Sequence, residues 1–378
     1  MALGRYLTLA LATILLAPIG FQSHADEAED QAYACSHGSP KEVIVACDRL
    51  IASHLVTGDG LAAAWHNIGR SYMDLAQFDP AIEAFDNAIR NDPDDSIALL
   101  NRGISNRSLG HFDLAIQDLD KVISLKPDYA FGFYARGSTY KSHGQYAEAI
   151  LDFNRALTIS PNMTEALVER GQTYFLQGKF SQAMQDLDAA IALNPSSGLA
   201  FMSRGSVYFG LGQYARAIQD EDTATKLLPH DGYVLFNRGS TYEKLGEYSR
   251  AIEDFDSGLA LATDPHALQY RCRLLAIVGQ KLDAALADCY KSIKLRPKDA
   301  DSFAARAFVY FRMKNYDDAI DDASAALAFD SKNASSLYIR GLAKLRNNDA
   351  AGGHADVSAA TSIDPKIAET FAGYGVKP

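Results

Sequence analysis

One spacing recurs along this chain and limits what it can fold into. A glycine, or a small residue in its place, returns nine times at steps of 33, 34 or 35 residues. A fixed period in the range of about 20–50 residues is typical of tandem supersecondary units. The sequence therefore predicts nine similar copies over residues 62–366. The recurring positions are Gly69, Gly103, Gly137, Gly171, Gly205, Gly239, Cys272, Ala307 and Gly341.

Each copy repeats the same apolar skeleton around that glycine. In the third copy, Phe133 lies four residues before Gly137 and Ala149 lies twelve residues after it. Spacings of three and four indicate helices, while Gly144 indicates a turn and Pro161 the end of the second helix. Each copy is thus predicted to form two antiparallel helices. One such pair cannot bury its apolar face alone, so the pairs must stack into an all-α solenoid.

This pattern resembles the tetratricopeptide repeat family, whose skeleton is W/F-x-x-x-G-x-x-Y…A-x-x-x-F…P. The resemblance covers residues 62–366. It implies a right-handed superhelix of about nine 34-residue helix-turn-helix repeats. Copies that read NRG and AI-x-D-x-D are similar to the exported bacterial members in which arginine replaces the usual leucine before the glycine.

The Arg-Gly pair inside the first helix needs a physical reason, because glycine in a helix costs about 0.5–1 kcal/mol relative to alanine. We expect each glycine to lie where the two helices of a pair come closest. The arginine occurs in eight copies, and the same eight carry an aspartate three residues after the alanine. The first copy has Ile68 and Ala84 instead.

This joint presence predicts a partly buried ion pair within each helix pair. Two of the expected pairs are Arg136 with Asp152 and Arg170 with Asp186. Such pairs set the register of packed helices more than they add net stability. We therefore assign them a structural and not a catalytic role.

The first 25 residues are of a different kind. Arg5 precedes the apolar run 7–21, and the triplet SHA permits cleavage after Ala25. This pattern predicts a secretory signal peptide and an exported protein, periplasmic or secreted. An uncleaved anchor is the alternative, which Pro18 and Gly20 disfavour. No later apolar run is long enough to span a bilayer.

Charge excludes some partner classes. Because Arg5 is the only charged residue of the signal peptide, its removal takes the net charge from −11 to −12. A chain this acidic is a poor ligand for nucleic acid or for anionic lipid.

Export also permits disulfides. In the N-terminal segment 26–61, residues 39–54 match the second helix of a repeat and are expected to cap the first copy. A bridge from Cys35 to Cys47 would pin the preceding segment to this helix. In the seventh copy Cys272 replaces the glycine and Cys289 replaces the apolar residue that faces it. A second bridge is expected there, with two buried thiols as the alternative.

The two ends of the repeat region are expected to be capped. The ninth copy is more polar than the others, as suits a solubilising last repeat. Residues 367–378 are predicted to form a tail or a short capping turn.

The sequence holds no pattern that indicates catalysis. The motifs HExxH, GxGxxG and GxSxG and the P-loop do not occur, and the histidines are scattered. The four cysteines lack the spacing of a zinc site. We therefore predict no enzyme activity, no metal and no cofactor.

Function is expected on the first helices. In the family, these helices line a concave surface that holds a peptide or a partner protein. The matching positions here are mostly apolar or aromatic, which favours a binding groove. Some of them could instead pack against neighbouring helices. The predicted lining is Leu100, Ile104, Arg107, Phe131, Tyr134, Lys141, Val168, Phe175, Met202, Phe209, Tyr233, Phe236 and Phe308.

The predicted function is a non-enzymatic scaffold of the cell envelope that binds a partner protein or peptide. The alternative is a periplasmic carrier or chaperone for hydrophobic ligands, which a copurified lipid would favour. The sequence leaves open whether the chain also forms a homo-oligomer.

Overall fold

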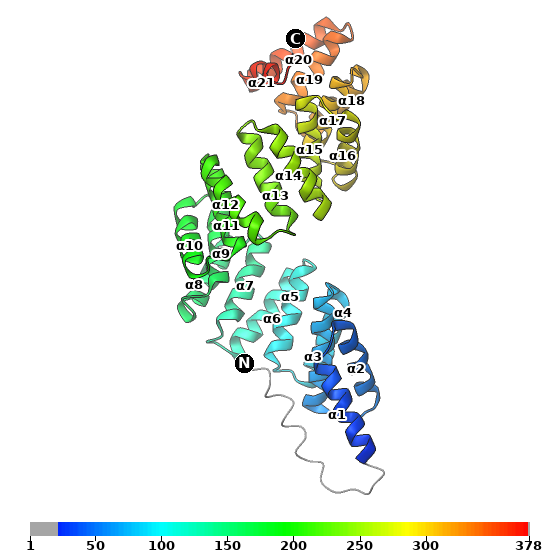
Figure 1. Ribbon diagram of the computed structural model, residues 1–378, viewed down its shortest axis with the longest axis vertical. Helices are drawn as coiled ribbons and strands as arrows, with labels where there is room; N and C mark the ends of the chain where they lie inside the picture. Colours follow the sequence, from blue (N-terminus) through cyan, green and yellow to red (C-terminus); the bar gives the residue numbers. More distant parts are fainter. Residues whose placement is uncertain (1–21, 377–378) are drawn as a thin grey trace. The chain divides into compact units, whose positions relative to one another are not determined.

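The structure is a computed structural model that describes residues 22–376, with side chains from residue 29 onward. This part of the chain contains 21 helices and no strand (Figure 1). The predicted signal peptide, residues 1–25, lies outside the described residues apart from its last four positions, which open the first helix. The chain divides into two compact units, Met1–Leu193 (unit 1) and Asn194–Pro378 (unit 2).

Unit 1 contains the first ten helices. They are α1 (Gln22–Ser36), α2 (Pro40–Ala52), α3 (Gly58–Asp74), α4 (Phe78–Asn91), α5 (Ser96–Ser108), α6 (Phe112–Leu125), α7 (Ala130–Ser142), α8 (Tyr146–Ile159), α9 (Thr164–Leu176) and α10 (Phe180–Leu193).

Unit 2 contains the other eleven described helices. They are α11 (Gly198–Gly210), α12 (Tyr214–Leu227), α13 (Gly232–Lys244), α14 (Tyr248–Leu261), α15 (Pro265–Val278), α16 (Leu282–Leu295), α17 (Ala300–Arg312), α18 (Tyr316–Phe329), α19 (Ala334–Arg346), α20 (Ala350–Ile363) and α21 (Ile367–Gly373).

From α3 to α20 the helices alternate as the first and second members of nine pairs, which confirms the predicted stack of helical hairpins. A first helix packs against the second helix of its own pair, as α7 does against α8. It also packs against the second helix of the preceding pair in the same unit, as α7 does against α6. Each pair therefore completes the core of its neighbour.

The turns inside the pairs follow the expected chemistry. Gly110, Gly144 and Gly178 have positive φ angles of 80°, 82° and 71°, a region that favours glycine. The first pair has Ala76 at its turn with φ of 54°, and the eighth has Lys314 with φ of 64°. These two residues take the same left-handed conformation at an energetic cost that the surrounding packing must offset.

The helical glycines mark the closest approach within each pair. A Cβ built on Gly137 would lie 2.9 Å from the ring of Phe153 and 3.2 Å from the carbonyl oxygen of Ala149. Gly239 is similarly close to Phe255, at 3.1 Å. A side chain at these positions would force the two helices apart, which explains a glycine inside a helix.

Both predicted disulfides are present. Cys35 and Cys47 join α1 to α2, with an S–S distance of 2.07 Å. Cys272 and Cys289 join α15 to α16, with an S–S distance of 2.06 Å. The α1 helix extends the expected half-repeat, because it packs against both α2 and α3.

The Arg–Asp ion pairs form within the helix pairs. Nε and Nη2 of Arg136 donate to the two carboxylate oxygens of Asp152 at 2.8 and 2.7 Å. The Arg170 guanidinium donates to Asp186 in the same way at 2.7 and 2.6 Å. The same two-bond geometry occurs in Arg102–Asp118, Arg204–Asp220, Arg238–Asp254, Arg271–Asp288, Arg306–Asp322 and Arg340–Asp356.

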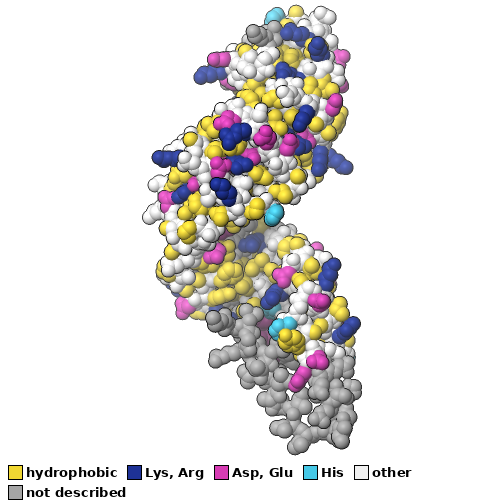
Figure 2. Space-filling view, viewed as in Figure 1, with side chains coloured by type: hydrophobic (Ala, Val, Ile, Leu, Met, Phe, Trp, Pro, Cys, Tyr) yellow, Lys and Arg dark blue, Asp and Glu magenta, His cyan; other side chains and the backbone are white. Residues whose placement is uncertain are grey.

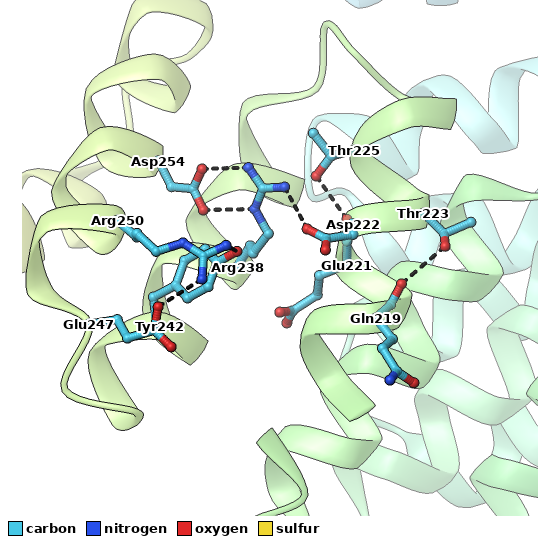
Figure 3. Close-up of polar contacts among 10 residues, drawn as sticks. All are labelled: Gln219, Glu221, Asp222, Thr223, Thr225, Arg238, Tyr242, Glu247, Arg250 and Asp254. Carbon is cyan, nitrogen blue, oxygen red and sulfur yellow. Dashed lines mark hydrogen bonds and ion pairs between the residues drawn. The ribbon is translucent and has the colours of Figure 1, made fainter. Parts of the chain in front are cut away.

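In most of these sites the arginine also makes a third contact, which the sequence analysis missed. Nη1 of Arg136 donates to Asp120, which lies on α6, the second helix of the preceding pair, at 2.5 Å. Arg238 reaches Asp222 in the same way at 2.8 Å, as Figure 3 shows. In six of the sites this acceptor lies 15 or 16 residues before the arginine, two residues after the previous copy's aspartate position. These are the sites of Arg102, Arg136, Arg170, Arg238, Arg271 and Arg340. One side chain therefore links two consecutive helix pairs.

Removing the arginine should destabilise the fold more than removing an exposed one. In Arg136→Met, Asp152 keeps a charge whose side chain is 8% exposed but loses its partner. We expect a loss of about 2–3 kcal/mol in the free energy of unfolding. Chemical denaturation followed by circular dichroism measures it.

The matched control is Arg155→Met. Arg155 is 49% exposed and lies 3.9 Å from Asp128, so its removal should change stability by less than about 0.5 kcal/mol. Equal effects of the two substitutions would contradict the structural role of the Arg136 contacts.

Loss of the first disulfide should release α1. The bridge spans 12 residues, and closing a loop of this size contributes about 3 kcal/mol. In Cys35→Ser/Cys47→Ser we expect the amides of α1 to exchange hydrogen much faster, while those of α7 stay protected. Hydrogen exchange with mass spectrometry reads both helices, and unchanged protection of α1 would show that packing alone holds it.

Candidate functional site

The candidate site is the surface formed by the first helices of consecutive pairs, here called the first-helix face of each unit. In unit 1 it is built by α3, α5, α7 and α9, which contact one another in sequence. Figure 2 shows hydrophobic side chains reaching the surface between charged ones over much of the viewed face.

Most of the predicted positions in unit 1 reach this face. Ile104, Phe131, Tyr134 and Phe175 are partly exposed, as is the charged Arg107. Their helices α5, α7 and α9 lie side by side.

Two of the predicted lining residues in unit 1 do not reach the surface. Leu100 is 4% exposed and packs with Leu119 and Val122 in the core. Val168 is 5% exposed. Both side chains are covered by neighbouring helices, so neither is available to a ligand in this structure.

The exposed part of unit 1 contains a row of aromatic rings on α7. Phe131 and Tyr134 lie with ring centroids 5.2 Å apart. Phe131 also approaches Tyr129 at 6.2 Å, and Tyr134 approaches Phe153 of the core at 6.2 Å. Burial raises the pKa of Tyr134, and the nearby Glu169 carboxylate raises it further. The two rings therefore pack against the core on one side and are partly exposed to solvent on the other, which suits contact with an apolar side chain.

Charged groups border these rings. Nζ of Lys141 lies 2.6 Å from a carboxylate oxygen of Glu169 and donates to Gln172 at 2.7 Å. Glu165, on the next first helix, is exposed. Lys141, one of the predicted lining residues, is thus paired across α7 and α9.

The predicted positions in unit 2 behave differently from one another. Met202 and Phe209 on α11 are partly exposed, and Tyr233 on α13 is 54% exposed. Phe236 is 7% exposed because it stacks on Phe255, with centroids 6.1 Å apart. It is therefore a core residue and not a ligand contact.

Phe308 on α17 is also buried, at 4% exposed, but for another reason. The C-terminal helix α21 covers it, and Phe371 lies 5.3 Å from its ring. A cavity of about 230 Å³ remains beside this contact. It is lined by residues of α15, α17, α19 and the C-terminal segment.

A buried carboxylate in unit 2 was missed by the sequence analysis. Glu221 on α12 is 1% exposed and lies four residues after the alanine of the fifth copy. No other copy has a charged side chain at this position, so aligning the copies would have identified Glu221 as an exception. The corresponding residues are Phe85, Leu119, Phe153, Leu187, Phe255, Cys289, Ala323 and Val357.

Glu221 is only partly satisfied. Oγ1 of Thr241 donates to its Oε1 at 2.9 Å, whereas Oε2 has no hydrogen-bond partner within the described part of the chain. Burial raises the pKa of Glu221 to about 7, and the Thr241 hydrogen bond and the Arg238 charge oppose this rise. In Figure 3 the carboxylate points away from the bonded groups around Arg238.

Two kinds of feature are not found among residues 22–376. No group of three or more histidine, cysteine or acidic side chains is arranged to hold a metal ion in the described chain. No described helix is long and apolar enough to cross a bilayer.

Glu221 should make the stability of the protein depend on pH. Its ordinary pKa is 4.5, so between pH 4.5 and 7 the unfolded chain loses a proton that the folded chain keeps. Stability from this group is full below pH 4.5 and falls by roughly 3 kcal/mol as the pH rises to 7. Glu221→Gln should remove that slope in denaturation curves measured across this range.

The control is Glu247→Gln, which changes an exposed carboxylate of the same unit. It should leave the pH dependence as in the wild type. A wild-type slope that persists in Glu221→Gln would show that other groups cause it.

Comparisons with known proteins agree with this architecture. A family model described as tetratricopeptide repeat matches residues 66–130 and 202–267, and a TPR repeat model matches 137–178 and 171–212. No curated protein sequence matches the chain. Likenesses to solved structures concern the fold alone, because their sequence identities are low.

A chain in the crystal structure of the APC/C hetero-tetramer Cut9-Hcn1 has a TM-score of 0.57 and 15% identity, covering 94% of this chain and 87% of that one. The human IFIT1 dimer with PPP-AAAA has a TM-score of 0.52 and 17% identity, covering 80% and 72%. The two family models together match more than half of the 378 residues. The chain belongs to the tetratricopeptide repeat family.

Proposed function

We propose that this protein is a non-enzymatic scaffold that binds a partner protein through the first-helix face of unit 1. The observation that carries the proposal is the pair of aromatic rings of Phe131 and Tyr134, which pack against each other and the core and are partly exposed to solvent. Rigid aromatic side chains of this kind are the usual anchors of protein interfaces. The repeat fold supports the proposal, since it is typical of proteins that bind other proteins.

The chemistry of the face suggests the chemistry of the partner. An apolar or aromatic segment would pack on Phe131 and Tyr134, while Arg107 on one side and Glu165 on the other offer opposite charges to its flanks. A segment with an apolar centre, an acidic residue at one end and a basic residue at the other would match this order.

We further propose that the protein works in the cell envelope or outside the cell. Two disulfides indicate an oxidising compartment. The apolar run at residues 7–21 with its cleavage pattern supports export.

The carrier alternative has less support. The cavity beside Phe308 has about 230 Å³, below the range of roughly 300–1,000 Å³ typical of small-molecule sites. Its lining also includes charged Arg273 and Asp301, which do not suit a lipid chain. A larger hollow of about 460 Å³ beside Tyr214 and Leu245 is open to solvent and does not enclose a ligand.

The proposal can be tested with a displayed library of random peptides selected on the full chain. Peptides that bind should lose affinity in Phe131→Ala/Tyr134→Ala, by about 2 kcal/mol or roughly thirtyfold in Kd. Fluorescence anisotropy with labelled selected peptides measures this change.

The matched control is Leu151→Ala, an apolar residue that is 67% exposed on the second helix α8. It should leave affinity unchanged. A library that yields no binder, or peptides that bind the Phe131→Ala/Tyr134→Ala variant as well as the wild type, would refute unit 1 as the binding face.

A further inference from the structure

The C-terminal segment of the chain lies on the first-helix face of unit 2. Ile367, Phe371 and Val376 are 3%, 4% and 4% exposed. The ring of Phe371 lies 5.3 Å from Phe308 on α17 and 5.0 Å from Tyr338 on α19. The apolar side of α21 thus covers residues that the family pattern would assign to ligand binding.

A cap of the last helix pair would need to contact only α19 and α20, but the C-terminal segment also contacts helices of earlier pairs. Tyr374 approaches Phe308 at 6.3 Å and Tyr248, at the start of α14, at 6.3 Å. Arg312 on α17 donates one hydrogen bond to the carbonyl oxygen of Tyr374 and another to that of Ile277 on α15, both at 3.3 Å. The segment therefore contacts α14, α17 and α19, which belong to three different pairs.

The fit is incomplete in two places. Tyr338 is fully buried, and its hydroxyl has no hydrogen-bond partner within the described residues. An unsatisfied buried polar group costs about 1–3 kcal/mol.

The second place is the cavity of about 230 Å³, which is bordered by the segment's own Thr370, Phe371 and Tyr374. Its other walls carry polar side chains from three first helices: Gln269, Arg273, Asp301, Asn333 and Ser335. Thr370 is too short to fill this space.

We propose that residues 365–376 are an intramolecular occupant of a protein-binding site on unit 2. The true partner is a short helical segment that carries an apolar residue, then aromatic residues four and seven positions later, as Ile367, Phe371 and Tyr374 do. It also carries a long polar side chain at the position of Thr370, which fills the cavity. This deepens the proposed function, because it rests on the first-helix faces being the binding faces.

Tethering explains how such a site would be regulated. A segment joined to the end of α20 by a few residues has an effective concentration in the millimolar range. A partner must therefore bind more tightly than the segment does in order to displace it. A partner that fits better would contact the walls of this cavity and bond the Tyr338 hydroxyl, which the segment does not do.

The experiment uses a fluorescein-labelled synthetic peptide with the sequence of residues 365–376, PKIAETFAGYGV. The host is the full chain with its own segment undocked by Phe371→Ala/Tyr374→Ala. We expect the peptide to bind this host at least about tenfold more tightly than it binds the wild type, in which the tethered copy competes. The same peptide with Thr370→Gln should bind the host more tightly still.

Two controls accompany these measurements. Adding Phe308→Ala to the undocked host should weaken peptide binding, because it removes the ring that Phe371 contacts. Ile363 at the end of α20 is 46% exposed, so Ile363→Ala in the wild-type chain should leave the affinity for the peptide unchanged.

Hydrogen exchange gives an independent reading on the wild-type chain. A displaceable segment should open often, so the amides of α21 should exchange at least about tenfold faster than those of α19. Equal protection of the two helices would make α21 a fixed cap and would overturn the proposal.

Other outcomes would overturn it as well. One is a peptide that binds neither the wild type nor the undocked chain, or that binds both equally. Another is a loss of helical circular dichroism signal in the Phe371→Ala/Tyr374→Ala chain, which would make the segment an integral part of the core. A Thr370→Gln peptide that binds no more tightly would refute the role of the cavity.

The two functional proposals fail separately. Phe131→Ala/Tyr134→Ala, introduced into the undocked host, should not change the affinity of the residue 365–376 peptide, because those side chains lie in unit 1. Loss of peptide binding there would contradict a site confined to unit 2. Failure of the library selection on unit 1 would leave this measurement intact.

Discussion

The stack of helix pairs depends on a guanidinium group that can bond in two directions. Arg136 uses Nε and Nη2 on Asp152 of its own pair and Nη1 on Asp120 of the preceding pair. The planar group holds these donors in a fixed fork, which a lysine ammonium cannot reproduce. One side chain thereby fixes both the packing of two helices within a pair and the position of that pair on its neighbour. The cost is a partly buried charge in eight of the nine repeats, which is tolerated because carboxylate partners are already in place.

Much of this fold could be predicted from the sequence because the period is explicit. The step between glycines predicted the pairs, and the joint presence of arginine and aspartate predicted contacts such as Arg170 with Asp186. The second carboxylate that each arginine contacts is often the later aspartate of a D-x-D motif. That aspartate belongs to one copy, and the arginine belongs to the next copy along the chain. The pairing of arginine with aspartate was sought only between residues of the same copy, so a contact between two copies was not found. Glu221 was overlooked although it breaks the pattern at a single core position.

The binding faces were harder to predict. Helical periodicity shows which residues share one face of a helix, but it does not show whether another segment of the chain covers that face. Leu100 and Phe236 share the expected side with Phe131, yet neighbouring helices bury them. Phe308 is covered by a segment more than 50 residues later in the chain, which no local pattern reveals. Unit 1 thus leaves Phe131 and Tyr134 partly exposed on α7, whereas unit 2 covers Phe308 on α17 with the end of the chain and leaves Tyr233 on α13 exposed.

The seventh pair adds a consequence of its own. In three other pairs, as between Gly137 and Phe153, an aromatic ring fills the space that the missing side chain leaves. Here Cys272 and Cys289 occupy those two places, and the covalent bond between α15 and α16 does the work of the ring. Because this bond forms only under oxidising conditions, the stability of this hairpin depends on the redox state of its surroundings as well as on packing.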